Sequence, residues 1–203
     1  MDLKERIVEE ASPLFFKNGI RSITMSDIAS DLGISKRTLY EVFRDKEELL
    51  KDVFSANMKC FDQKIEDLAK SSENVIEALM RIYALHLRSS QDFNRSLVHD
   101  LKKYYPTIYR QIQSKKQNGF QSFIPLMRTG VEQGLIREDT NFEVVTWLVK
   151  AQFKTLIDDE YIPTDKYSTN EFIQAIIINF IRGIATPLGH THIDRIIKGI
   201  KQE

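Results

Sequence analysis

Residues 23–50 read ITMSDIASDLGISKRTLYEVFRDKEELL, and the spacing of small and apolar residues in this stretch decides the fold of the N-terminal region. Ala29 lies on the apolar face of a short predicted helix and is small enough to let a second helix cross closely. Gly33 breaks this helix, and Leu39 and Phe43 point back inward from the next one. Two short helices joined by a tight glycine turn indicate a helix-turn-helix unit.

Three polar residues mark the helix starts in this region. Thr24, Ser35 and Asp45 each precede a run with helical spacing, and their side-chain oxygens can accept a hydrogen bond from the first turn of a helix. We expect the three helices to run to about residues 32, 43 and 70.

The rest of the chain also has helical spacing. The sequence has only five prolines and eight glycines, and no segment alternates with a period of two. The predicted fold class is therefore all-α. The further helices are expected at about residues 2–18, 72–89, 92–104, 106–133, 141–158, 169–184 and 193–201.

Composition limits the function. The 29 lysine and arginine residues are balanced by 29 aspartate and glutamate residues, so any binding to DNA must come from a local patch rather than from bulk charge. The longest apolar run, at residues 175–178, is too short to cross a membrane, and the charged N-terminus does not resemble a signal peptide. The single cysteine cannot form an internal disulfide, and the four histidines are scattered rather than spaced as zinc ligands. We expect a cytoplasmic protein with no metal, cofactor or membrane partner.

The predicted second helix of the motif has the residues that reading a DNA groove requires. At 100° per residue, Arg37 and Glu41 point away from Leu39, with Tyr40 and Lys36 on one flank. Arginine can bond both acceptors of guanine, O6 and N7, whereas lysine and tyrosine can bond phosphate oxygens. The alternative is an ordinary surface helix with mixed charges, because residues 35–46 carry a net charge of only 4 − 2 = +2.

This stretch resembles the N-terminal domain of the TetR/AcrR family of regulators. The residues that carry the resemblance read T-x-x-x-I-A-x-x-L-G-I-S-x-x-T-L-Y-x-x-F-x-x-K-x-x-L from Thr24 to Leu49, and residues 130–139, GVEQGLIRED, resemble a connection between two later helices of the family. The resemblance implies a three-helix DNA-binding domain at residues 1–46 and a helical domain for ligand sensing and dimerisation at residues 47–203. Carried over to matching positions, it assigns DNA contacts to Thr24, Ser35, Lys36, Arg37, Thr38, Tyr40 and Lys46.

Glu41 departs from a basic or neutral reading surface. Its carboxylate could accept a hydrogen bond from cytosine N4, or it could lean away from phosphate in a salt bridge. We favour the salt bridge.

The predicted helices at residues 141–158 and 169–184 offer the best surface for a dimer. A helix that is apolar on more than one face must be buried by a partner or deep in its own core, and both interpretations stay open here. Together with the family resemblance, the pattern favours a homodimer that places two reading helices about 34–36 Å apart, one turn of DNA. The interface residues are Val144, Trp147, Leu148, Ala151, Phe172, Ile173, Ile176, Ile177, Phe180 and Ile184.

The middle of the chain is rich in aromatic residues that could line a pocket for a small molecule. Ligand pockets are mostly apolar with a few polar groups, but aromatic residues at helical spacing also serve as plain core. The candidate lining residues are Tyr83, His86, Tyr104, Phe120, Phe123 and Trp147.

The sequence therefore favours a regulator of transcription, by default a repressor, that binds a palindromic operator as a dimer and is released by an unidentified small molecule. No glycine-rich phosphate loop and no nucleophile-base pattern occurs, so we predict no catalytic residue and no enzyme activity. The alternative is a helical interaction module that has lost sequence-specific DNA binding.

Overall fold

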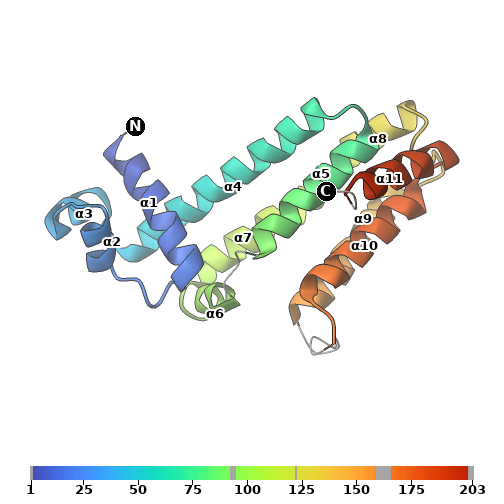
Figure 1. Cartoon of the computed structure of the whole chain (residues 1–203). Helices are drawn as coiled ribbons and strands as arrows, with labels where there is room; N and C mark the ends of the chain where they lie inside the picture. Colours follow the sequence, from blue (N-terminus) through green and yellow to red (C-terminus); the bar gives the residue numbers. More distant parts are fainter. Residues whose placement is uncertain (1, 92–94, 122, 159–165, 201–203) are drawn as a thin grey trace. The chain divides into compact units, whose positions relative to one another are not determined.

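The computed structural model describes residues 2–91, 95–121, 123–158 and 166–200. Its helical content confirms the all-α fold class, and none of the helices in these ranges is long and apolar enough to span a membrane. Figure 1 colours them in chain order. The eleven helices of the described residues are α1 (Leu3–Asn18), α2 (Met25–Asp31), α3 (Lys36–Val42), α4 (Lys46–Ser71), α5 (Val75–Gln91), α6 (Arg95–Tyr104), α7 (Pro106–Gln121), α8 (Phe123–Glu132), α9 (Phe142–Asp158), α10 (Thr169–Ile184) and α11 (Pro187–Ile200).

The chain contacts divide into two compact units, each with its own apolar core. The first unit comprises residues 1–64 and 89–116, and the second comprises residues 65–88 and 117–203. The first unit thus combines α1–α3 and α6 with parts of α4, α5 and α7. The functional division that we expect at residues 46 and 47 stays a prediction.

The helix-turn-helix begins and ends as its capping residues predict. The Thr24 hydroxyl accepts a hydrogen bond from the Asp27 backbone amide, and the Asp27 carboxylate accepts one from the Thr24 amide at 2.7 Å, which completes a capping box at the start of α2. Ser35 Oγ accepts a hydrogen bond from the Thr38 amide (3.0 Å) at the start of α3. Gly33, between the two helices, has a φ of +66°, which glycine adopts without the steric cost of a side chain.

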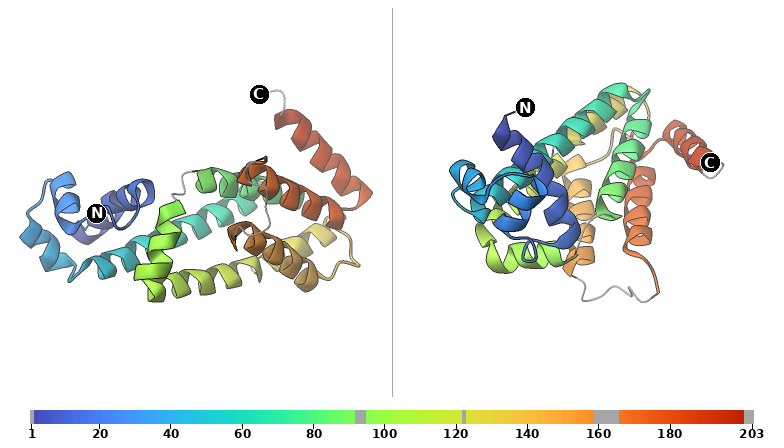
Figure 2. Two further views of the ribbon diagram at one scale, coloured as in Figure 1. Left: turned by 90° about the horizontal axis from the view of Figure 1, so that it is seen from below. Right: turned by 60° about the vertical axis from the view of Figure 1, so that its left-hand side comes forward.

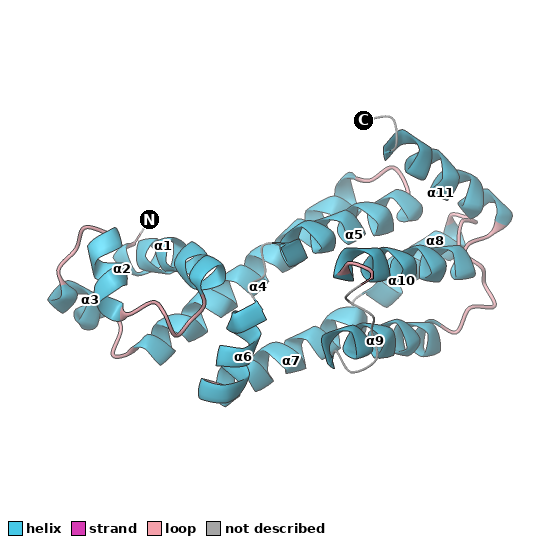
Figure 3. Cartoon of the chain, turned by 60° about the horizontal axis from the view of Figure 1, so that its bottom comes forward, coloured by secondary structure: helices cyan, strands magenta, loops and turns pink. Residues whose placement is uncertain are grey.

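The core of the first unit determines which side of α3 stays outside. Leu39 and Phe43 are fully buried together with Phe15 from α1, Ile28 from α2 and Leu49 from α4. Figure 1 shows α1–α3 gathered at the beginning of α4, and Figure 3 shows the short loop that joins α2 to α3. Because burial of each large apolar side chain contributes about 1.5–3 kcal/mol, rotation of α3 about its axis would be costly.

The second unit packs α9 and α10 against each other and against α5, α8 and α11. Its core includes Ile76 from α5, Met127 from α8, Phe142 from α9 and Ile184 from α10, together with Ile193 from α11. Figure 2 shows α9 and α10 as neighbouring helices of this unit. Only one side of α9 contributes to this core, which leaves its other side exposed.

The expected segment 106–133 contains two described helices, α7 and α8. Residue 122, between them, lies outside the described residues.

The last helix begins earlier than its apolar spacing predicts. α11 starts at Pro187 rather than near residue 193, because Thr186 Oγ1 accepts a hydrogen bond from the Gly189 amide (3.1 Å). A threonine cap followed by proline at the first helical position is a common helix start. This signal was present in the sequence.

Candidate DNA-binding surface

The outer side of α3 presents polar and charged residues. Lys36, Arg37 and Tyr40 are exposed, and Tyr40 retains 45% of its accessible surface. Leu39, one position before Tyr40, is fully buried on the opposite side. The wheel drawn from the sequence therefore describes the two faces of α3 correctly, and the exposed face has the donors that a DNA groove requires.

Three of the residues predicted to contact DNA also hold the helix starts. Thr24 and Ser35 are the cap residues of α2 and α3, and the Thr38 and Ser35 hydroxyls lie 2.8 Å apart. Thr24 and Ser35 are exposed, while Thr38 is half-buried. Their first role is therefore to fix where the two helices begin, and DNA contacts from them stay predictions.

Glu41 forms the salt bridge that we favoured from the sequence. Arg37 Nε donates a hydrogen bond to Glu41 Oε1 at 2.9 Å, one helical turn further along α3. Both side chains are exposed on the outer face. The carboxylate on this surface is thus paired with a cation of the same helix.

Lys46 turns its ammonium group into the protein. At the first position of α4, its Nζ donates hydrogen bonds to the backbone carbonyls of Ile20 and Ile23 and lies 5.7 Å from the centre of the Phe15 ring. Burial lowers the pKa of Lys46 below its usual value, against the opposing effect of Asp100. The side chain therefore ties α4 to the loop between α1 and α2. A phosphate contact would require it to leave these carbonyls.

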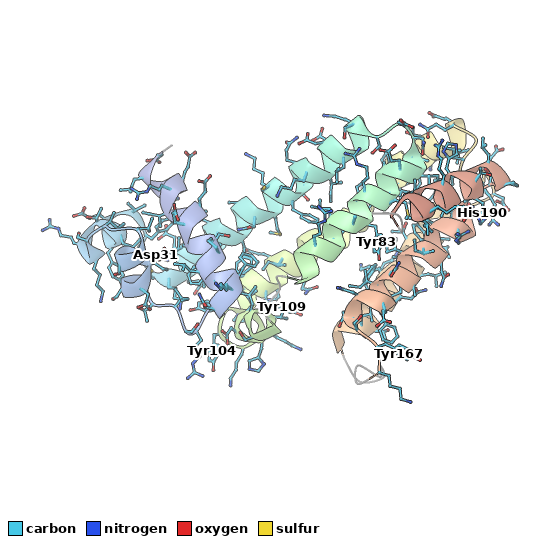
Figure 4. The ribbon with its side chains drawn as sticks, in the orientation of Figure 1. Asp31, Tyr83, Tyr104, Tyr109, Tyr167 and His190 are labelled. Atoms are coloured by element: carbon cyan, nitrogen blue, oxygen red, sulfur yellow. The ribbon has the colours of Figure 1, made fainter. Side chains whose placement is uncertain are left out.

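A buried carboxylate on α6 holds the same loop. Asp100, with 7% of its surface exposed, accepts a hydrogen bond from the Arg21 backbone amide at 2.9 Å. The Arg21 guanidinium lies 5.6 Å from the centre of the Tyr104 ring, and Figure 4 marks Tyr104 at the end of α6. Sequence reasoning missed this contact, because nothing in the local pattern connects residues 79 positions apart.

The predicted dimer residues differ in exposure between the two helices. On α9, Val144 is 51% exposed, Trp147 is 62% exposed and Leu148 is 56% exposed, and Ala151 continues the stripe. On α10, Ile184 belongs to the core, and the other predicted residues are half-buried: Phe172, Ile173, Ile176, Ile177 and Phe180. The apolar surface open to a partner thus lies mainly on α9.

The residues predicted to line a ligand pocket have different environments. Tyr83 is buried on the side of α5 that faces α10 (Figure 4), and burial raises its pKa to about 12. Phe123 packs against the second core, whereas His86 and Trp147 are exposed. Tyr104 belongs to the first unit and is exposed. The Phe120 side chain lies outside the described residues.

Three buried hydroxyl groups in the second unit have no hydrogen-bond partner among the described residues. They are Tyr83 Oη on α5, Thr140 Oγ1 just before α9, and Thr146 Oγ1 on the inner side of α9. A buried polar group without a partner is unfavourable by about 1–3 kcal/mol, so such groups can mark where a ligand or water binds. Composition and spacing alone do not single out Thr146.

A cavity of about 420 Å³ lies within the first unit, between α4 and α7. It was not predicted from the sequence. Its apolar part is formed by Phe54, Met58, Ile108 and Ile112, and its remaining lining residues are Lys51, Ser55, Gln111 and Ser114. The volume is within the range of small-molecule sites.

The N-terminal helices match a known family. The model of the bacterial regulatory proteins of the tetR family matches residues 7–53, which extend from α1 into α4. This match covers the whole helix-turn-helix, including both cap residues and the exposed face of α3.

Similar proteins extend the likeness over most of the chain. HTH-type transcriptional regulator YvaF of Bacillus subtilis is 26% identical over 185 residues, which cover 90% of this chain and 95% of that protein. HTH-type transcriptional repressor KstR2 of Mycobacterium tuberculosis is 23% identical over 145 residues, covering 68% and 72% of the two chains. A solved transcriptional regulator from Saccharomonospora viridis, in complex with choline, has 22% identity and a TM-score of 0.71 and covers 90% and 97% of the two chains. The N-terminal helices therefore match the tetR family, and the chain is similar over most of its length to transcriptional regulators.

Proposed function

We propose that this regulator binds a palindromic operator as a homodimer and is released from it by a small molecule. The observation that carries the proposal is the outer face of α3, where Arg37 and Tyr40 are exposed while Leu39 anchors the helix from behind. A recognition helix needs this arrangement, because its outer side chains must reach base edges in the major groove.

Each outer side chain of α3 has a chemical role in this proposal. The Arg37 guanidinium donates hydrogen bonds to guanine, while Lys36 and Tyr40 bond phosphate oxygens on either side of the groove. Near the starts of α2 and α3, the DNA phosphate backbone is approached by Thr24, Ser35 and Thr38. Lys46 supports the surface from inside, through the carbonyls of the α1–α2 loop.

Dimerisation uses the exposed stripe of α9. Val144, Trp147 and Leu148 place three large apolar side chains on one face, and adjacent apolar groups of this kind mark protein interfaces. The half-buried residues of α10 border this face, because α9 and α10 pack together. A two-fold dimer allows two copies of α3 to read two half-sites.

The small molecule binds inside the second unit and shifts the dimer to a state with weaker affinity for DNA. The unpartnered hydroxyls of Tyr83, Thr140 and Thr146 support this location, and a related regulator has been solved with choline. A ligand changes DNA affinity only by binding the two states unequally, and the effect is reciprocal: DNA must weaken ligand binding by the same factor.

DNA binding can be tested with duplexes selected from a random library by the full-length protein. Fluorescence anisotropy should show a selected duplex bound more tightly than a scrambled one, with a steep loss of affinity as salt is added. Lys36→Ala should reduce the salt slope by about one phosphate contact, whereas Lys64→Ala, an exposed lysine on α4, should not. Equal affinity for both duplexes and a flat salt response would support the interaction module instead.

The ligand response can be tested at Tyr83. Choline and a metabolite library would be screened by thermal shift, and each binder titrated with and without the selected duplex. Tyr83→Phe removes an unpartnered hydroxyl, so it should leave the free protein as stable or more stable while lowering its affinity for the ligand. Met58→Trp, which fills part of the α4–α7 cavity, is the comparison variant. Identical ligand affinity with and without DNA would exclude the release mechanism.

A further inference from the structure

We infer that Glu41 is a positioning residue for base reading, because it orients the Arg37 guanidinium so that its two terminal amino groups point toward the duplex. The inference rests on the proposed binding of DNA by α3 and adds the means of sequence discrimination. Glu41 itself touches no base in this arrangement and acts through Arg37.

The hydrogen bond between the two side chains leaves the useful part of the guanidinium free. Arg37 Nε donates to Glu41 Oε1 at 2.9 Å. The guanidinium has five N–H donors in a rigid plane, and this contact uses the single donor on Nε. The two terminal nitrogens retain the fork geometry that matches O6 and N7 of guanine. Holding Nε therefore restricts the fork to fewer orientations before DNA arrives.

The pair occupies the part of α3 that faces away from the core. The Arg37 side chain is 89% exposed and that of Glu41 is 60% exposed, while Leu39 between them is fully buried on the other side. Residues four apart lie on the same face of a helix. The carboxylate is thus beside the fork on the surface that enters the groove.

Helix stability does not explain the pair. Arg37 lies in the first turn of α3 and Glu41 near its last residue, so each charge is at the less favourable end of the helix dipole. Glutamate after its cation is also the weaker order for an i,i+4 pair, and exposed pairs contribute little. The effect of the pair is therefore expected in binding rather than in folding.

The charge of Glu41 opposes binding to any DNA sequence, since a carboxylate on this face is repelled by phosphates. That unfavourable effect is offset only where Arg37 meets a guanine. A neutral chain with equal numbers of acidic and basic residues already has little bulk attraction for DNA. Glu41 therefore lowers the affinity for DNA of any sequence and raises the preference for guanine at one base pair in each half-site.

The test uses full-length protein and one duplex selected by the wild type from a random library. Affinities are measured by anisotropy for this duplex, for its single-base-pair variants and for a scrambled duplex. The variants are Arg37→Ala, Glu41→Ala, Glu41→Gln and the double substitution Arg37→Ala with Glu41→Ala. Glu66→Ala is the matched control, because Glu66 forms the same kind of exposed i,i+4 pair with Lys70 on α4.

Arg37→Ala should reduce the preference for guanine at one position about tenfold or more. Glu41→Ala should lower the preference at that same position severalfold and raise the affinity for scrambled DNA. Glu41→Gln should keep much of the preference, because its amide oxygen still accepts from Nε, yet should gain general affinity as Glu41→Ala does. The double variant should be no less selective than Arg37→Ala, and Glu66→Ala should match the wild type.

Three results would overturn the inference. An unchanged guanine preference in Glu41→Ala would show that the carboxylate does not position Arg37. A loss at a different base pair, retained in the Arg37→Ala background, would make Glu41 a direct reader of cytosine. A wild type that prefers no sequence would refute the proposed operator binding itself, together with the inference.

Discussion

The outer faces of α3 and α9 are both exposed, yet their chemistry is opposite. α3 presents Lys36, Arg37 and Tyr40, whereas α9 presents Val144 and Trp147 with further apolar residues in the same stripe. A polar face can stay in water or meet phosphates and base edges, but a large apolar face is more stable when another apolar surface covers it. Exposure alone therefore does not identify a contact surface, whereas the type of exposed side chain indicates which kind of partner each face fits.

The two faces also differ in how their residues are supported. Polar groups around α3 are held by short hydrogen bonds within the unit, such as those of Thr24 and Ser35. The α9 stripe is held by its inner side, where Phe142 and Val149 are buried. Substitutions on α3 should thus change local stability or DNA binding. Substitutions on α9 should change the association of protomers.

The largest effect is expected from a charge on the α9 face. Leu148→Asp should dissociate the proposed dimer, because an uncompensated charge buried at the proposed interface costs about 3–5 kcal/mol and occurs once in each protomer. Sedimentation velocity measures the change. Leu188→Asp on α11 is the control, since Leu188 is 55% exposed outside the stripe. Equal dissociation by both variants would contradict the assignment of the interface to α9.

A smaller effect separates the two sides of α3. Leu39→Ala should lower the free energy of unfolding by about 2–5 kcal/mol, because it removes a fully buried side chain. Tyr40→Ala should change stability by no more than about 0.5 kcal/mol but weaken DNA binding. Urea unfolding and anisotropy measure the two quantities. If Tyr40→Ala were as destabilising as Leu39→Ala, the outer face would be part of the core.

Lys46 tests whether a cation of the DNA-binding region is structural. Lys46→Met should cost about 1–3 kcal/mol of stability, because the Ile20 and Ile23 carbonyls lose their donor. Lys64→Met, at an exposed position, should cost little. Unchanged stability with a reduced salt slope would instead favour a phosphate contact.

The burial of Lys46 also predicts that the unfolding free energy depends on pH. Burial lowers the pKa of Lys46 below 10.5, so the folded chain releases this proton before the unfolded chain does. Between the lowered pKa and 10.5 the unfolded state binds more protons, and the unfolding free energy of the wild type, relative to Lys46→Met, should rise with pH. A difference that falls with pH over this interval would be inconsistent with burial of the ammonium group.

The smallest effect concerns the start of α2. Hydrogen bonds from Thr24 lower the pKa of the Asp27 carboxyl below its usual 3.8. The stabilisation is therefore complete above 3.8 and is lost as the pH falls through the lowered value. The difference in unfolding free energy between wild type and Asp27→Ala should be small at neutral pH and vanish in acid. Asp31→Ala, at the other end of α2, is the comparison variant, because the hydrogen bonds of Thr24 go to Asp27.

Local signals were sufficient for much of the fold. The limits of α2 and α3 follow from Thr24, Gly33 and Ser35, whose hydrogen bonds or φ angles involve neighbours within a few residues. The same holds for α10, which spans the expected residues after its cap at Ser168. The early start of α11 was missed, although Pro187 carried the signal.

By itself, the sequence determined the helix-turn-helix and the two faces of α3, because caps, turns and helical periodicity act over a few residues. Only the tertiary structure decided that Lys46 turns inward, that Asp100 holds the loop at Arg21, and that α9 rather than α10 keeps its apolar face open. These outcomes depend on groups brought together from distant parts of the chain, where local pattern provides no information about which partner a side chain will meet.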